Sequence, residues 1–136
     1  MSTIFNKLNL TDQREILVLN PPASFELELK KLKSVQVTRD LNSLPALRFM
    51  LAFVIQKEDI DHVAEQIKEK IEGDAIIWFA YPKKTAKSYV THINRDKGWD
   101  SVEQLGFKGV RQVAIDETWS AIRFRLKEFV GASRKA

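Results

Sequence analysis

The sequence predicts a three-layer α/β fold, with an open, mostly parallel sheet between helices and an antiparallel hairpin at its C-terminal end. Strand-like and helical segments alternate along the 136 residues, which is typical of parallel sheets with crossover helices. Residues 48–55 and 75–81 are apolar at most consecutive positions, as in strands that are covered on both faces. Residues 116–119, between the last two strand-like segments, are too few for a crossover helix, so these two strands should pair antiparallel.

The first predicted elements are a strand, a helix and a second strand. Residues 15–19 form a short apolar run, and the Asn-Pro-Pro sequence at residues 20–22 ends it. Residues 25–32 predict a helix because apolar residues recur on one face, and Ser24 is placed to cap it. Residues 34–38 alternate and are rich in β-branched side chains, which predicts the second strand.

The middle of the chain predicts a strand, a long helix and another strand. Residues 48–55 predict the third strand. Residues 59–72 predict the clearest helix, since isoleucine, valine and alanine residues form a stripe and acidic residues lie outside it. Gly73 suits the left-handed conformation that ends many helices. Residues 75–81 predict the fourth strand, which Pro82 ends because proline has no N–H for the sheet.

The last third predicts a short helix over residues 99–105 and two strands over residues 110–115 and 120–126. Alternate side chains of the final strand should face the core. The opposite face of that strand carries Trp119, Arg123 and Arg125. Together the elements predict a Rossmann-like sheet, in a reduced form of the plan found in S-adenosylmethionine-dependent methyltransferases; this is an analogy of fold.

The size and composition indicate one domain over residues 1–130, followed by a basic flexible tail at residues 131–136. Hydrophobic residues make up 44% and charged residues 29%, which is ordinary for a globular protein. The absence of cysteine excludes disulfides, thiolate metal sites and cysteine nucleophiles. With two histidines and no recognisable catalytic set, we expect no metal, no cofactor and no catalytic residues.

The N-terminal sequence lacks the basic and apolar regions of a secretory signal, and the longest apolar run is too short for a membrane-spanning helix. We therefore expect a cytoplasmic protein with no membrane contact.

Positive charge is concentrated in two segments. Residues 1–122 carry 17 Lys/Arg and 17 Asp/Glu, so the last fourteen residues account for the net charge of +4. Residues 81–97 hold five basic residues and one acidic residue. A local basic loop attracts anions more strongly than the overall charge implies, although such lysines often only keep a loop soluble.

The expected ligand site lies where the parallel strands end, because open α/β sheets bind ligands beyond their carboxyl ends. Four segments should converge there: residues 20–22, 56–57, 81–84 and 116–117. The candidate ligand-binding residues are Asn20, Tyr81, Lys83, Lys84, Lys87 and Trp119.

The turn after the first strand is unlike a nucleotide-binding loop. Such loops need glycines, so that backbone amides can approach the ligand. Residues 20–24 read Asn-Pro-Pro-Ala-Ser, with no glycine and two prolines that lack an amide hydrogen. The Asn-Pro-Pro triplet is similar to the Asn/Asp-Pro-Pro-aromatic motif of amino-group methyltransferases, but Ala23 replaces the aromatic and the motif follows the first strand instead of the fourth.

Three stretches carry a resemblance to a family: residues 15–22, residues 78–84 (Trp-Phe-Ala-Tyr-Pro-Lys-Lys) and residues 114–124 (Ala-Ile-Asp-Glu-Thr-Trp-Ser-Ala-Ile-Arg-Phe). They resemble a family of small uncharacterised bacterial proteins, a domain of unknown function. Its members share a strand that ends in Tyr-Pro-Lys and a closing Ile-Asp-Glu-x-Trp-Ser-x-x-Arg-Phe hairpin. The resemblance implies a Rossmann-like fold and a bacterial, cytoplasmic origin, and it implies no activity.

The sequence therefore supports a small, non-catalytic Rossmann-like domain that binds a small anionic ligand or a protein partner at the carboxyl edge of its sheet. The alternative is a divergent or degenerate S-adenosylmethionine-dependent methyltransferase. A third option is a homodimer joined through the face that carries Trp119, Arg123 and Arg125. Nucleic acid is not an expected partner, because no basic stripe interleaved with exposed aromatic residues is present.

Overall fold

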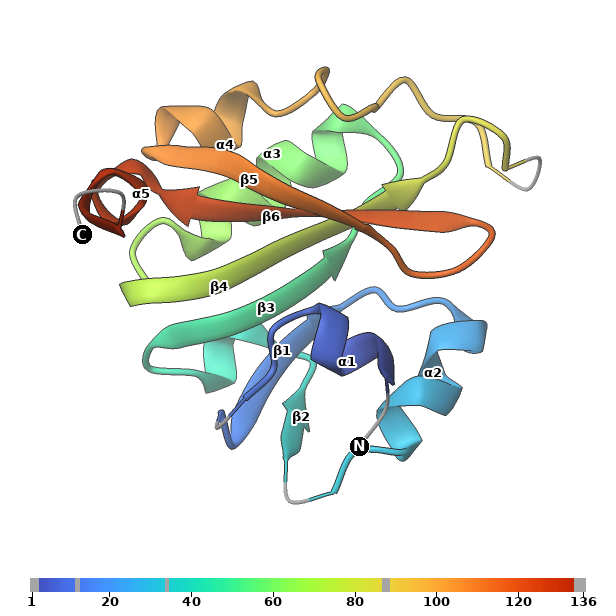
Figure 1. The fold of residues 1–136 in the computed structure, drawn as a ribbon, viewed down its shortest axis with the longest axis horizontal. Coiled ribbons are helices and arrows are strands. Elements are labelled where there is room, and N and C mark those ends of the chain that lie inside the picture. Colours follow the sequence, from blue (N-terminus) through green and yellow to red (C-terminus); the bar gives the residue numbers. More distant parts are fainter. Residues whose placement is uncertain (1–2, 12, 34, 87–88, 134–136) are drawn as a thin grey trace.

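The computed structural model describes residues 3–11, 13–33, 35–86 and 89–133. It contains one six-stranded sheet in the order β2-β1-β3-β4-β6-β5 (Figure 1). The strands are β1 (Glu15–Leu19), β2 (Gln36–Thr38), β3 (Leu47–Phe53), β4 (Ile71–Pro82), β5 (Phe107–Ala114) and β6 (Trp119–Leu126). β1 to β4 are parallel, and β6 runs antiparallel between β4 and β5. The predicted fold class, including the C-terminal antiparallel hairpin, is confirmed.

Helices lie on both faces of this sheet. They are α1 (Thr3–Lys7), α2 (Ala23–Lys30), α3 (Lys57–Ile67), α4 (Asp100–Gln104) and α5 (Lys127–Ser133), with a short 3-10 helix at Leu41–Ser43. Side chains of α1 and α2 form one buried cluster with the sheet, and side chains of α3 and α4 form a second cluster on its other face. Figure 1 shows α1 in front of the sheet and α3 behind it.

The sheet is buried on both faces where these clusters meet it. In β4, Trp78 and Ala80 face α1 and α2, whereas Ile77 and Phe79 face α3 and α4. The indole Nε1 of the fully buried Trp78 donates a hydrogen bond to the carbonyl oxygen of Leu8, at 2.8 Å. This bond satisfies the polar atom of Trp78 and fixes the segment after α1 to the central strand.

Several predicted boundaries differ from the structure, and the largest difference lies between α3 and β4. The helix predicted over residues 59–72 ends at Ile67, and Ile71 begins β4 by pairing with Leu47 of β3. Gly73, expected to end that helix, lies instead inside β4 with a φ of +59°. Strand pairing with β3 therefore prevails over the helical pattern of the last predicted turn.

The start of α2 also differs from the prediction. Ser24 is not the cap but the second residue of the helix, and Pro22 occupies the N-cap position without a side-chain hydrogen bond. The carbonyl oxygen of Pro22 accepts hydrogen bonds from the amides of Phe25 and Glu26.

The sequence patterns did not predict α1, the 3-10 helix or α5, which are too short to show clear periodicity. α5 continues to Ser133, into the segment predicted as a tail, and residues 134–136 lie outside the described residues. In the part of the chain that the structure describes, no helix combines the length and apolarity needed to cross a membrane.

Candidate functional site

The carboxyl edge of the parallel strands contains a cavity of about 320 Å³. It lies where the chain order of the sheet reverses, since β1 has β2 on one side and β3 on the other. Ligands of open α/β sheets bind at such a point. The cavity is lined by Asn20, Pro22, Phe53, Ile55, Asp59, Tyr89 and Trp119.

Asn20 turns the chain sharply at the end of β1. Its φ of +56° is in the left-handed region, which asparagine tolerates better than most residues. Pro21 and Pro22 follow and offer no amide hydrogens to a ligand. Asn20 and Pro22 line the cavity, and of these two residues Asn20 has the polar side chain.

Aromatic rings form one wall of the cavity. The ring centroids of Phe53 and Trp119 are 5.0 Å apart in an edge-to-face arrangement, and those of Tyr89 and Trp119 are 5.1 Å apart. Phe25 lies behind Phe53, with 5.0 Å between their centroids. This contiguous packing holds the rings of Phe53 and Trp119 in place as a preformed apolar surface.

Asp59 brings the carboxylate of the cavity. Its Oδ2 accepts hydrogen bonds from the amides of Ile55 and Gln56, both at 3.0 Å. Asp59 and Gln56 form a reciprocal capping box at the start of α3. These bonds fix the carboxylate beside the end of β3, so its negative charge is part of the rigid framework.

The segment that carries Tyr89 is tied to the same corner. The Gln56 side-chain amide donates to the carbonyl oxygen of Val90 at 2.7 Å, and the Thr91 hydroxyl donates to the carbonyl oxygen of Ile55. Tyr89 therefore reaches Trp119 from a segment anchored to the start of α3.

Two of the four segments predicted to converge, residues 20–22 and 81–84, lie at this edge. Asn20 and Trp119 line the same cavity, and Trp119 pairs with Pro82 at the end of β4. The amide of Lys83 donates to the carbonyl oxygen of Thr118 at 2.7 Å, which places the start of the basic loop beside β6.

Two of the predicted lysines are near the cavity but do not line it. Lys83 is half-buried and Lys84 is exposed, and neither belongs to the cavity wall. Lys87 lies outside the described residues.

Tyr81 is at the same end of the sheet but on its other face. Its ring packs against Trp99, with 5.8 Å between centroids, and its hydroxyl oxygen accepts a hydrogen bond of 2.6 Å from the Gln112 side chain. Burial raises the pKa of the Tyr81 phenol. Tyr81 is thus a core residue in this structure, and it does not face the cavity.

The candidate residues chosen from the sequence do not include Phe53, Ile55, Asp59 or Tyr89, which line the cavity. A signal existed for Asp59, because the spacing of Gln56 and Asp59 is that of a capping box at the start of a helix. No local pattern could place Tyr89, which reaches the cavity through contacts distant in sequence.

Further cavities lie elsewhere, among them one of about 250 Å³ lined by residues of α1 and α2 and by Ile115 and Asp116. Another of about 490 Å³ lies between α4 and β5, and one of about 980 Å³ lies at the amino edge of β1, β3 and β4. Among the described residues, no cluster of histidine, aspartate or glutamate side chains could hold a metal ion.

No protein-family model and no curated protein matches the sequence. Solved structures are similar in fold. The ribosomal protein L11 methylase of Lactobacillus delbrueckii subsp. bulgaricus aligns with a TM-score of 0.57 and 8% identity, over 90% of this chain and 76% of that one. A SAM-dependent methyltransferase of Aquifex aeolicus aligns with a TM-score of 0.52 and 14% identity, over 90% of this chain and 87% of that one. The chain therefore has the Rossmann-like fold of these methyltransferases.

Proposed function

We propose that this chain is a divergent methyltransferase that binds S-adenosylmethionine in the cavity lined by Asn20 and Trp119. The observation that carries the proposal is a cavity with aromatic walls and one carboxylate, at the switch point of a methyltransferase-type sheet. The fold favours ligand binding at this point of the sheet, and the side chains that line the cavity favour S-adenosylmethionine as the ligand.

The cavity chemistry suits a cationic ligand that contains a planar ring and no phosphate. Aromatic faces such as those of Trp119 and Tyr89 attract cations and stack on planar rings. The Asp59 carboxylate adds a fixed negative charge. S-Adenosylmethionine combines a sulfonium cation with an adenine ring, whereas dinucleotides carry phosphates that need a glycine-rich amide cradle.

The fit to this ligand has one departure from the usual arrangement. Because Pro21 and Pro22 lack amide hydrogens, the polar end of the ligand would be held by the Asn20 side chain and by the first amides of α2. The volume of about 320 Å³ is at the lower end for small-molecule sites, so part of the ligand would lie outside the cavity. When bound, S-adenosylmethionine supplies a methyl group to a nucleophile.

Isothermal titration with S-adenosylhomocysteine and S-adenosylmethionine tests the proposal. We expect saturable binding that Tyr89→Ala weakens at least about fivefold, because stacking on an aromatic ring is worth about 1–3 kcal/mol. Asn20→Gly keeps the left-handed turn while removing the side-chain amide, and should also weaken binding. Lys84→Ala is the matched control, because this exposed side chain is outside the cavity.

The absence of heat and of any thermal shift at millimolar ligand would reject the proposal, since a bound ligand must raise the unfolding temperature. Binding that Tyr89→Ala and Lys84→Ala reduce equally would place the ligand elsewhere.

A second candidate function is a non-catalytic domain that binds a small anion or a protein partner at the same edge. The diproline turn favours it, because this turn lacks the amides of a conventional cofactor loop. Lys83 and Lys84 also make no ion pair with a described residue, so both ammonium groups remain available. Titration with phosphorylated metabolites tests the anion version: equal binding by the wild type and the Lys83→Ala/Lys84→Ala variant would reject it.

A further inference from the structure

Four basic side chains occupy neighbouring positions on one face of the β5–β6 hairpin. Arg111 pairs directly with Arg123, and Lys108 pairs directly with Arg125. Residues directly opposite each other in an antiparallel pair have their side chains on the same face of the sheet. Like charges in this arrangement repel each other. We call these four residues, Lys108, Arg111, Arg123 and Arg125, the cationic face.

A β-bulge creates this arrangement. Lys108 and Arg111 are three residues apart, so in a regular strand their side chains would point to opposite faces. The register shifts between Gly109 and Arg111, so Val110 is an extra residue with no partner in β6. Because of this extra residue, Arg111 lies opposite Arg123 while Lys108 stays opposite Arg125. Bulges commonly redirect a side chain near a functional site.

Arg123 is half-buried where the cationic face meets the segment after α1, and it has an incomplete set of partners. Its Nη1 donates to the Asn9 side-chain oxygen over a long 3.4 Å, and its buried Nε has no hydrogen-bond partner among the described residues. Burial, and then the positive charges of Arg125 and Arg111, lower the pKa of the Arg123 guanidinium, while Asp74 opposes this effect. A guanidinium so placed would gain from an added anion.

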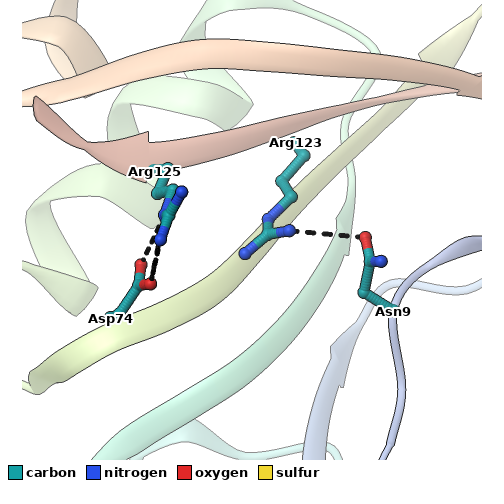
Figure 2. A network of polar contacts seen from close by, with 4 residues as sticks. All are labelled: Asn9, Asp74, Arg123 and Arg125. Atoms are coloured by element: carbon teal, nitrogen blue, oxygen red, sulfur yellow. Dashed lines mark hydrogen bonds and ion pairs between the residues drawn. The ribbon is translucent and has the colours of Figure 1, made fainter. Parts of the chain in front are cut away.

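One carboxylate neutralises part of this charge. The Arg125 guanidinium binds Asp74 through two nitrogens, at 2.6 to 3.1 Å, beside Arg123 in Figure 2. Lys108, Arg111 and Arg123 form no ion pair with any described residue. The cationic face therefore keeps an excess of positive charge.

We propose that the cationic face binds the phosphate group of a small molecule, with Arg123 and Arg111 as its principal ligands. Guanidinium groups match phosphate oxygens in geometry as well as charge. A phosphate would also remove the repulsion between the cross-strand pairs. A second copy of this chain is a poorer occupant, because a twofold interface would press two positive faces together.

The proposal is independent of the proposed function. β6 is antiparallel to β4 and starts at the carboxyl edge with Trp119, so Arg123 and Arg125 lie farther toward the other edge. Loss of the phosphate site and loss of S-adenosylmethionine binding would therefore be separate results, measured with different ligands and different variants.

The test is a titration with inorganic phosphate against chloride at equal ionic strength, followed by the arginine Nε–Hε signals in ¹H–¹⁵N NMR spectra. We expect the Arg123 signal to shift and saturate with phosphate but not with chloride. Arg111→Gln should weaken this binding at least threefold, and Lys33→Gln, at an exposed lysine outside both proposed sites, should leave it unchanged. Arg111 is exposed on an edge strand, so this variant should fold.

Thermal unfolding tests the proposal through two effects of Arg111→Gln, one without phosphate and one with it. Without phosphate, Arg111→Gln should raise the unfolding temperature, because it removes one repulsive pair. With phosphate, the increase in unfolding temperature should be smaller for Arg111→Gln than for the wild type. A residue with a purely structural role would not produce both effects.

Three results would overturn the proposal. One is equal shifts with phosphate and chloride, which would mean ionic screening only. Another is unchanged phosphate binding by Arg111→Gln. The third is saturation by a single-stranded oligothymidylate while inorganic phosphate fails to saturate, which would assign the face to nucleic acid instead.

Discussion

One face of the sheet has an apolar half that helices cover and a half that carries positive charge. Over β1, β3 and β4 it is covered by α1 and α2 and is lined by residues such as Phe53 and Trp78. Over β6 and β5 it carries the cationic face, with Arg123 half-buried at the boundary and bonded to Asn9 after α1 (Figure 2).

The change occurs within a single strand. Along β6, Trp119 and Ala121 belong to the apolar cluster of the covered half, whereas Arg123 and Arg125 follow on the same face of the sheet. Burial of Trp119 is favourable through its apolar area, but burial of a guanidinium without an anion is costly. The covered half is therefore expected to stabilise the fold. The cationic half is expected to lower the stability of the fold, because its positive charges are only partly neutralised.

Trp119→Ala should have the largest effect on stability. Loss of a nearly fully buried indole that contacts Phe53 and Tyr89 should lower the free energy of unfolding by about 3–5 kcal/mol. The matched variant Arg111→Gln in the cationic half should change it by less than about 0.5 kcal/mol. Urea denaturation at pH 7 measures both values. Similar losses for the two variants would show that the halves do not differ in this way.

Sequence reasoning succeeded where one face of an element had to be buried. The first strand, residues 15–19, was predicted with the bounds that β1 has. The shared face of Trp119, Arg123 and Arg125 followed from alternation, and the hairpin followed from a connection too short for a helix.

The sequence could not show features that depend on register or on distant contacts. Tyr81 lies on a strand covered on both faces, where alternation cannot tell which face a side chain takes. The bulge that aligns Lys108 with Arg111 is a property of strand pairing. The cavity combines Asn20 and Tyr89, which are 69 positions apart, through tertiary contacts alone.

Tyr81 lies on the opposite face of the sheet, and Tyr81→Phe tests how its buried phenol affects stability at alkaline pH. Burial raises the pKa of the folded Tyr81 phenol above its unfolded value near 10. Its contribution is therefore fully present below pH 10 and is lost as the pH rises through the folded pKa, by up to about 1.4 kcal/mol per pH unit. The wild type should lose more stability than Tyr81→Phe between pH 9 and 11 in urea denaturation. Parallel curves for the two proteins would contradict this.

Asp74→Asn should destabilise the cationic half by about 1 kcal/mol, because it leaves Arg125 without its partly buried partner. The loss should be larger at low salt, where repulsion among the basic residues is least screened. Glu72→Gln is the matched control, since it breaks the more exposed pair with Arg48 and should cost less than about 0.5 kcal/mol. A loss independent of salt would mean that packing, and not charge, explains the role of Asp74.

The smallest predicted effect is the repulsion between Arg111 and Arg123, and a double-mutant cycle isolates it. Arg111→Gln and Arg123→Gln should each remove the same unfavourable pair, so the double variant should gain less than the sum of the two single variants. The coupling should be about 0.3 kcal/mol at low salt and near zero at 1 M salt, where the screening length is about 3 Å. The cycle cancels the separate loss of the Asn9 hydrogen bond, which occurs whenever Arg123 is replaced. A coupling of opposite sign would mean that the two guanidinium groups stabilise each other, and the excess charge on this face would then need no anion to balance it.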